Sequence, residues 1–226
     1  GFYSLKASVD PISASSELKR KRVNSLYGKL SLSWASTYFL DVTGRNDWSS
    51  TLSKETRSYF YPSLAGSIVL SEIITLPEVW NFWKIRGSWT QTKFPTDVYD
   101  INSTYSVSRN YWGNMTAAFY PSTIRDVSLR PRASRSYEIG TELYFFKNRL
   151  KFDLAYYHKI LYDLQRYVDM SYASGFSNTL INYGEEQLSR GVEFTISGDI
   201  IKQKDFTWTS SFNWAADRYY YSKIDE

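Results

Sequence analysis

Hydrophobic and polar residues alternate one by one along most of this chain. In the segment 28–34, glycine, leucine and tryptophan occupy one phase, and lysine and serine occupy the other. Successive side chains of a β-strand point to opposite faces, so this pattern is typical of strands with one apolar and one polar face. Charged residues keep to the polar phase in the same way in the segments 38–45, 84–89, 138–143, 151–154 and 192–196. The pattern predicts an all-β chain.

The alternating segments define about nine strands, separated by turn-forming residues. Several of them are longer than the roughly 5–6 residues of an average soluble strand, and a tilted strand of that length crosses a bilayer. Residues 70–83 are expected to contain a helical turn, and 94–133 either an additional hairpin around Tyr105 to Trp112 or a folded loop. The predicted strands lie near 1–9, 20–34, 37–48, 58–70, 83–93, 134–146, 149–163, 180–198 and 206–218.

The connections between these strands alternate between short and long. Outer-membrane barrels have short periplasmic turns and longer extracellular loops, so the alternation favours such a barrel. The tight links are 35–37, 147–148 and 202–205, and the long links are 49–57, 94–133 and 164–179.

Aromatic residues are abundant, with 20 Tyr, 13 Phe and 8 Trp among 226 residues. Clusters near strand ends suit the aromatic girdles of a membrane barrel, although the same residue types favour β-strands in any protein. The clusters are Trp34 with Tyr38 and Phe39, Trp48 with 59–61, 145–146, and 219–221.

Alternation alone does not say which face of the sheet is wet. A soluble carbohydrate-binding β-sandwich alternates as well, with its apolar faces turned inward. In a membrane barrel, Lys or Arg on the lipid-facing side costs roughly 2–4 kcal/mol at the bilayer midplane, which would explain the separation of charges. An odd number of strands leaves unpaired edges that lipid does not tolerate. We therefore expect residues 1–226 to be a partial β-barrel domain.

Composition excludes several other classes. No run of about 18 uncharged apolar residues is present, so no transmembrane helix is expected, and no targeting segment is visible. The chain has no cysteine and hence no disulfide framework. The formal charge of +4 comes from well-mixed residues apart from the run 19–22, which we interpret as a solvated strand end and not a nucleic-acid site.

Specific stretches of the sequence resemble the barrel of SusC-like TonB-dependent transporters. The segment 38–50 (YFLDVTGRNDWSS), followed by 58–63 (SYFYPS), is similar to a hairpin of that family, and the order and spacing of the later motifs agree. A departure lies at 129–132 (LRPR), where the family usually carries an acidic residue after the proline. The later motifs are Leu76-Pro77, 84–89 (KIRGSW), 136–140 (SYEIG), 145–150 (FFKNRL), 174–176, 180–182, 184–185 and 191–193.

This resemblance implies an antiparallel transmembrane β-barrel segment, part of a large plugged barrel of about 22 strands in the outer membrane of a Gram-negative cell. It also implies that the plug domain and the closing strands are absent from this chain. It implies TonB-dependent uptake of oligosaccharides or peptides, with no cofactor and no enzymatic activity. The implied partners are a SusD-like surface lipoprotein, the TonB complex acting through the missing plug region, and outer-membrane lipid. A siderophore-type receptor of the same broad class is an alternative, as is the carbohydrate-binding sandwich.

Two groups of residues are candidates for ligand binding. Arg45 and Asp47 share the polar phase near the expected extracellular rim, followed by Trp48, and either contact ligand or form an ion pair that anchors the next loop. The run Arg109, Asn110, Tyr111 and Trp112 combines hydrogen-bonding groups with aromatic faces, a combination that suits sugars or peptides, or else loop packing.

No catalytic or metal site is expected from the remaining residues. His158 is the single histidine, so a histidine-rich metal site or a serine–histidine relay cannot form within the chain, and we interpret it as structural. The acidic pairs Asp163 with Asp169 and Glu185 with Glu186 are interpreted as solvated lumenal groups and not as glycosidase carboxylates.

Overall fold

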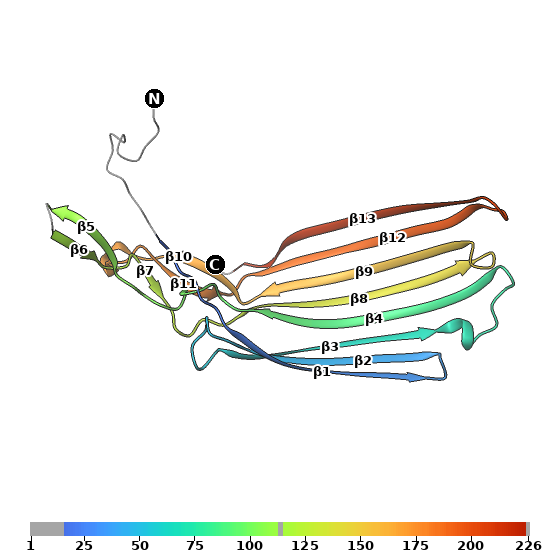
Figure 1. Ribbon diagram of the computed structural model, residues 1–226, viewed down its shortest axis with the longest axis horizontal. Helices are drawn as coiled ribbons and strands as arrows, with labels where there is room; N and C mark the ends of the chain where they lie inside the picture. The colour runs from blue at the N-terminus through green and yellow to red at the C-terminus, as the bar shows by residue number, and fades with distance from the viewer. Residues whose placement is uncertain (1–15, 113–114, 225–226) are drawn as a thin grey trace, which may run out of the picture.

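The computed structural model describes residues 16–112 and 115–224. Its main element is a curved eight-stranded sheet with the order β1-β2-β3-β4-β8-β9-β12-β13, in which every neighbouring pair is antiparallel (Figure 1). Strands β1 and β13 are the two edges of this sheet. The strands are β1 (Val23–Trp34), β2 (Tyr38–Ser49), β3 (Ser58–Val69), β4 (Trp80–Phe94), β8 (Arg132–Phe145), β9 (Leu150–Tyr162), β12 (Glu186–Lys202) and β13 (Thr207–Lys223).

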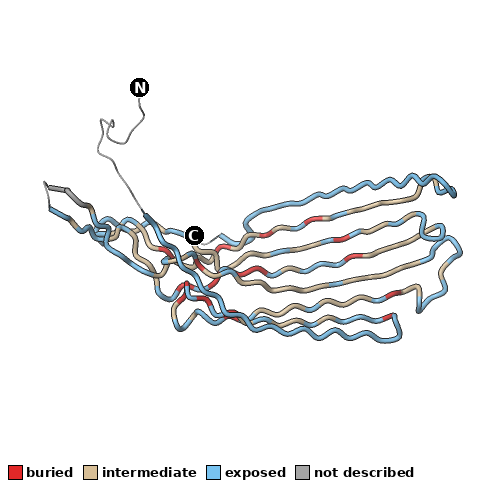
Figure 2. The backbone as a smooth tube through the Cα atoms, viewed as in Figure 1, coloured by how far each residue is buried: buried red, intermediate tan, exposed pale blue. Residues whose placement is uncertain are grey.

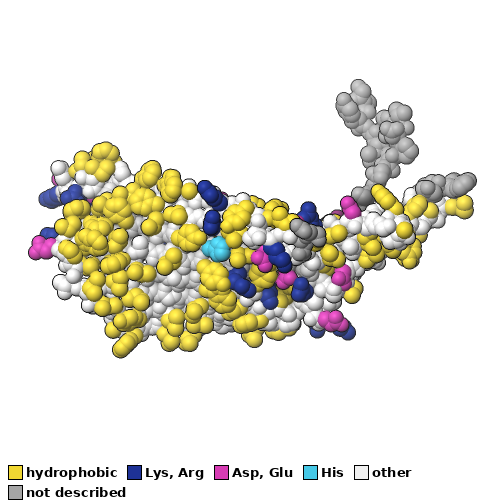
Figure 3. All heavy atoms as spheres, turned by 180° about the vertical axis from the view of Figure 1, so that it is seen from behind, with side chains coloured by type: hydrophobic (Ala, Val, Ile, Leu, Met, Phe, Trp, Pro, Cys, Tyr) yellow, Lys and Arg dark blue, Asp and Glu magenta, His cyan; other side chains and the backbone are white. Residues whose placement is uncertain are grey.

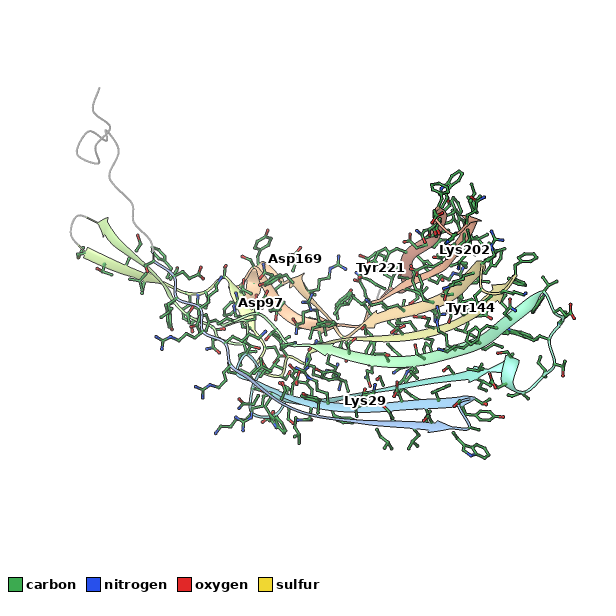
Figure 4. All side chains as sticks on the ribbon, turned by 45° about the vertical axis from the view of Figure 1, so that its right-hand side comes forward. Lys29, Asp97, Tyr144, Asp169, Lys202 and Tyr221 are labelled. Carbon is green, nitrogen blue, oxygen red and sulfur yellow. The ribbon has the colours of Figure 1, made fainter. Side chains whose placement is uncertain are left out.

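The predicted tight links and the predicted long links lie at opposite ends of the sheet, which we call the turn end and the loop end, although the turn end also holds the link 70–79, which is longer than 50–57 at the other end. The turn end holds the predicted tight links and the segment 70–79, which begins with the 3-10 helix η2 (Leu70–Glu72) and so confirms the predicted helical turn. The loop end holds 50–57, 95–131 and 163–185. In Figure 4 Asp97 and Asp169 lie at the loop end and Lys202 at the turn end.

The loop end carries two further small sheets. The predicted hairpin in 94–133 is confirmed as β5 (Ser106–Trp112) and β6 (Met115–Phe119), which project beyond the main sheet (Figure 1). A three-stranded sheet has the order β10-β11-β7, and β11 pairs in parallel with β7. Its elements are β7 (Thr123–Arg125), β10 (Leu164–Asp169) and β11 (Asn178–Tyr183), with the 3-10 helix η3 (Tyr172–Ser174) between the last two.

Two sequence predictions about strands need correction or fall outside the structure. The single strand predicted at 180–198 is wrong, because β11 ends at Tyr183 and β12 begins at Glu186 in a different sheet. The intervening Glu185 is buried and forms an ion pair with Arg166 of β10. The link predicted at 164–179 accordingly contains β10 and the start of β11. The strand predicted at 1–9 lies outside the described residues.

The pairing register sorts the side chains of the main sheet onto two faces. Leu30, Val42 and Leu64 lie side by side in adjacent strands, and the apolar residues of β4, β8, β9, β12 and β13 continue on the same face. We call this the outward face, and the opposite, polar face the inward face. The apolar phases predicted from sequence are therefore confirmed as one continuous surface.

No second sheet covers the outward face within the described residues. Leu30, Ile139 and Phe212 remain 55%, 59% and 58% exposed. A soluble β-sandwich would bury these side chains against a facing sheet, so the sandwich alternative is wrong. Figure 3 shows this face, with hydrophobic side chains spread over the strands.

Many buried residues lie where the main sheet meets the loops, and others are scattered singly along the strands (Figure 2). Leu129 is fully buried there, and Leu52 and Leu180 are only 5% and 4% exposed. The packed core of this chain therefore holds the loops in place on the sheet. Among the described residues, none of the helices has the length and apolarity needed to cross a membrane.

Candidate ligand-facing site

Arg45 and Asp47 lie together on the inward face of β2. Arg45 Nε donates to Asp47 Oδ1 at 2.8 Å, and the Tyr61 hydroxyl of β3 donates to Asp47 Oδ2 at 2.7 Å. The Arg45 guanidinium also lies over the Tyr61 ring, 5.9 Å from its centroid. Asp47 is 5% exposed, whereas the Arg45 side chain is 46% exposed. Asp47 thus holds a guanidinium that faces the inward space.

A second inward cluster crosses three strands nearer the middle of the sheet. Arg86 of β4 donates two hydrogen bonds to the Asp153 carboxylate of β9, at 2.7 and 2.8 Å, and lies 3.6 Å from Glu138 of β8. A bidentate pair of this kind fixes the orientation of the guanidinium as well as its position.

Gly140 of β8 makes this crossing possible. A Cβ atom at this position would lie 2.8 Å from Arg86 Cζ and 2.9 Å from its Nε. Atoms at that separation overlap, so any other residue would displace the arginine. The glycine lets Arg86 lie flat across β8 and reach Asp153 on the next strand.

The loops at the loop end are joined by buried or half-buried polar contacts. Thr96, 1% exposed, donates its hydroxyl to the carbonyl of Thr51, 3% exposed, at 2.9 Å. Arg125 pairs with Asp100 at 2.7 Å. The first contact joins 50–57 to 95–131, and the second joins two parts of 95–131.

Acidic residues of the third loop are held by arginines. Glu185 accepts from Arg166 at 2.5 Å and is 8% exposed, so its interpretation as a solvated group is wrong. Asp163 accepts from Arg130 at 2.9 Å.

Hydrogen bonds within the 95–131 loop also shape its charge. The Ser128 hydroxyl and backbone N–H both donate to the Asp126 carboxylate at 2.7 Å. The hydroxyl bond is the larger cause, and together the two bonds lower the pKa of Asp126 below its ordinary value. Asp126 therefore keeps its charge to lower pH than a free aspartate.

The structure brings together some of the residues predicted for ligand binding and separates others. Trp48 points to the outward face, because it pairs with Asn24 and Ser58 on the phase opposite to Asp47. The structure therefore does not place it in one cluster with Arg45 and Asp47. The backbone of Arg109, Asn110, Tyr111 and Trp112 forms part of β5, on the projecting hairpin, while their side chains lie outside the described part of the chain.

His158 lies on the outward face of β9 and stacks on Tyr137, with ring centroids 6.4 Å apart. This contact agrees with its interpretation as a structural residue. Within residues 16–112 and 115–224, no group of three or more His, Cys, Asp or Glu side chains is arranged to hold a metal ion.

Sequence reasoning missed Tyr61 and the Arg86, Glu138 and Asp153 cluster as inward groups that contact one another. The polar phase already placed Arg86, Glu138 and Asp153 on the right face. Their contact could not be found because β4 and β8 pair across the whole 95–131 loop, and local alternation carries no information on that pairing. Tyr61 had a signal, since it shares the inward phase of the neighbouring strand in a predicted hairpin.

Residues 2–226 match the family model described as "TonB dependent receptor-like, beta-barrel". The chain is 26% identical over 224 residues to TonB-dependent receptor P3 of Formosa agariphila, which covers 96% of this chain and 22% of that receptor. It is 27% identical over 202 residues to TonB-dependent receptor SusC of Bacteroides thetaiotaomicron, with coverage of 86% and 20%.

Two further proteins are similar to this chain. A 124-residue part of the chain is 36% identical to the ferripyoverdine receptor of Pseudomonas aeruginosa, covering 51% of this chain and 15% of that protein. The fold is similar to that of the RagAB peptide importer in its open-open state, with a TM-score of 0.82, 21% identity, and coverage of 99% of this chain and 25% of the other. The chain thus spans about a fifth of the curated relatives' length.

Proposed function

This chain belongs to the β-barrel family of TonB-dependent receptors and lies in the outer membrane, and from that premise we propose that the whole protein imports oligosaccharides or peptides through TonB. The observation that carries the proposal is the match of nearly the entire chain to that family's barrel. The similarity to SusC and to a peptide importer supports glycans or peptides as the ligand class. Transport of this kind needs no chemistry from these residues.

The two faces of the sheet support a transport role in physical terms. The outward face has the exposed apolar surface that a bilayer covers, and the inward face carries the Arg45 and Arg86 clusters. In a barrel built from such strands, the inward face borders a polar interior. A hydrophilic ligand could pass there without being taken into lipid.

Ligand contact is assigned to the inward cluster and to the projecting hairpin. Arg45 is held by Asp47 and remains half exposed, so its guanidinium can meet a carboxylate or a sugar hydroxyl. The run Arg109, Asn110, Tyr111 and Trp112 lies on a hairpin that extends away from the sheet (Figure 1). A lipoprotein of the SusD type, acting as a lid on the loop end, is proposed as the partner that completes the site.

Uptake by cells that carry the full-length protein tests this proposal. Cells lacking other receptors should take up labelled oligosaccharide or peptide only when the full-length protein and TonB are both present. The variant Arg45→Gln should reduce uptake, while the matched inward variant Lys159→Gln, remote from the candidate site, should not. Failure of every oligosaccharide and peptide pool to enter would contradict the proposal.

A siderophore-type receptor is the second candidate, supported by the 36% identity to the ferripyoverdine receptor over part of the chain. The two candidates differ in their ligand and in the partner protein. Uptake of a ferric siderophore, together with the absence of a co-purifying lipoprotein, would favour this candidate.

A further inference from the structure

The carboxylates of the main sheet lie on one of its faces, whereas its basic residues lie on both. In the regularly paired parts of the strands, every carboxylate lies on the inward face, and Glu186, at a register shift, pairs with Lys223. The inward carboxylates are Asp41, Asp47, Glu138, Glu142, Asp153, Glu193, Asp199 and Asp217. The outward face carries cations and His158 but none of these acids. The outward basic residues are Lys93, Arg135, Arg190 and Arg218.

Three of these groups form a row across neighbouring strands. His158 of β9 pairs with Arg190 of β12, which pairs with Arg218 of β13. Adjacent strands lie about 4.8 Å apart, so the row extends over about 10 Å. Arg135 of β8 lies one row nearer the loop end, paired with Ile160. We call His158, Arg135, Arg190 and Arg218 the outward basic row.

The outward basic row lies at the height where a lipid head group would be. Arg218 is about eleven residues along β13 from its turn-end start, which at about 3.3 Å per residue and a tilt of about 40° is about 28 Å above the turn end. Arg135 and His158 are about 25 and 20 Å above it by the same reasoning. The apolar band of an outer-membrane barrel is about 25 Å tall. Arg135 and Arg218 therefore lie at the outer edge of the apolar band, and His158 lies about 5 Å within it.

No carboxylate of the described residues neutralises the arginines of the row. Arg135 lies over the Tyr162 ring, 5.5 Å from its centroid, and Arg190 lies over the Tyr220 ring at 5.6 Å. None of the ion pairs in the part of the chain that the structure describes involves Arg135, Arg190 or Arg218. Tyrosine rings hold two guanidinium groups at the lipid face with their charge available to an anion.

A hollow adjoins the row on the side of the bilayer interior. Gly66 of β3 and Gly87 of β4 pair with each other on the outward face and leave a space of about 640 Å³. Its outward lining is apolar and includes Ile139 and Tyr156. Tyr137 also lines the hollow and stacks on His158, so the hollow and the basic row are continuous. In Figure 3 basic side chains and the histidine interrupt the hydrophobic surface of this face, and acidic side chains accompany the basic ones toward the loop end.

We propose that this surface binds a phosphorylated lipid of the outer leaflet, with its phosphate on the outward basic row and an acyl chain in the hollow at Gly66 and Gly87. Arginine forms charge-assisted, bidentate hydrogen bonds with phosphate, and an apolar hollow at membrane depth suits a hydrocarbon chain. The inference rests on the outer-membrane location and is independent of the proposed import function. A lipid bound here would fix the rotation and height of the barrel in the bilayer.

Binding of defined lipids to the purified full-length protein in detergent tests the proposal. The probes are bisphosphorylated lipid A, the same lipid A with both phosphates removed, and inorganic phosphate, each followed by native mass spectrometry and by the thermal unfolding midpoint. Bisphosphorylated lipid A should bind saturably, and the dephosphorylated lipid at least about tenfold more weakly, since each basic group near a lipid phosphate contributes about fivefold. Inorganic phosphate alone should not raise the unfolding midpoint.

Variants separate the two halves of the surface. Replacement of Arg135, Arg190 and Arg218 by glutamine should weaken binding of the phosphorylated lipid at least about tenfold, while the inward control Lys159→Gln leaves it unchanged. Gly87→Leu should weaken lipid binding because its side chain fills the hollow. The strand accepts this change, since an added Cβ atom at position 87 would lie 3.8 Å from the nearest atom, the backbone oxygen of Glu138, which is an ordinary van der Waals distance. Equal binding of the phosphorylated and dephosphorylated lipids by the unmodified protein would overturn the proposal. It would also be overturned if inorganic phosphate raised the unfolding midpoint as much as the phosphorylated lipid does.

Discussion

An arginine placed on the outward face in the middle of the sheet should destabilise the protein far more than one placed on the next residue. Val42 points outward from β2 and is 38% exposed, so its replacement removes little packing, whereas Thr43 points inward. Val42 is about four residues from the turn-end start of β2, which places it about 10 Å above that end, close to the centre of an apolar band about 25 Å tall.

The expected cost of Val42→Arg is about 2–4 kcal/mol, the value for arginine at the bilayer midplane, and for Thr43→Arg it is below about 1 kcal/mol because that side chain meets the polar interior. The assay is urea unfolding of the full-length protein in lipid vesicles, followed by heat-modifiable electrophoretic mobility. Val42→Gln controls for loss of the valine without added charge. Equal destabilisation by the two arginines, or a larger effect at position 43, would refute the assignment of the faces.

Two further changes test local features of the sheet. Ala35 and Ser36 form the turn between β1 and β2, and φ is 51° at both residues. This left-handed conformation costs about 1 kcal/mol or more for most residues. The double variant Ala35→Asn and Ser36→Gly should therefore stabilise the protein by about 1–2 kcal/mol in the same urea titration, and no gain would contradict the assigned turn. Gly140→Val should displace Arg86 from Asp153. A double-mutant cycle with Arg86→Met and Asp153→Asn measures the coupling free energy between these two side chains. That coupling should be about 0.5–1 kcal/mol when residue 140 is glycine and close to zero when it is valine. An unchanged coupling would show that the pair does not need the glycine.

Much of the fold follows from alternation and turn spacing. Leu30, Trp34 and Val42 lie on the predicted apolar face, and the division into short and long connections locates the two ends of the sheet, because both signals arise from neighbouring residues. The split between β11 and β12 could not be predicted, since the alternation continues through Tyr183 into the next strand. Pairing with β10 and β7 in a separate sheet breaks the strand there, and that pairing is a tertiary effect.

The candidate site was predicted less completely than the fold. The polar phase identified Arg45 and Asp47 correctly as neighbours, but Trp48 belongs to the opposite face by the same two-residue rule. The outward basic row was not anticipated, because each of its members looks like an isolated exception to alternation. It becomes a cluster only when the register of β8, β9, β12 and β13 is known.

Accessibility of spin labels along β9 tests the central claim most directly, namely that the outward face touches acyl chains while the inward face borders water. The described chain contains no cysteine, so single cysteines at positions 151 to 156 of the full-length protein, with any cysteine elsewhere replaced, can each carry a nitroxide. In lipid vesicles, labels at Phe152, Leu154 and Tyr156 should collide with oxygen, which partitions into lipid. Labels at Lys151, Asp153 and Ala155 should favour a water-soluble nickel chelate. A reversed two-residue alternation, or none, would contradict the account.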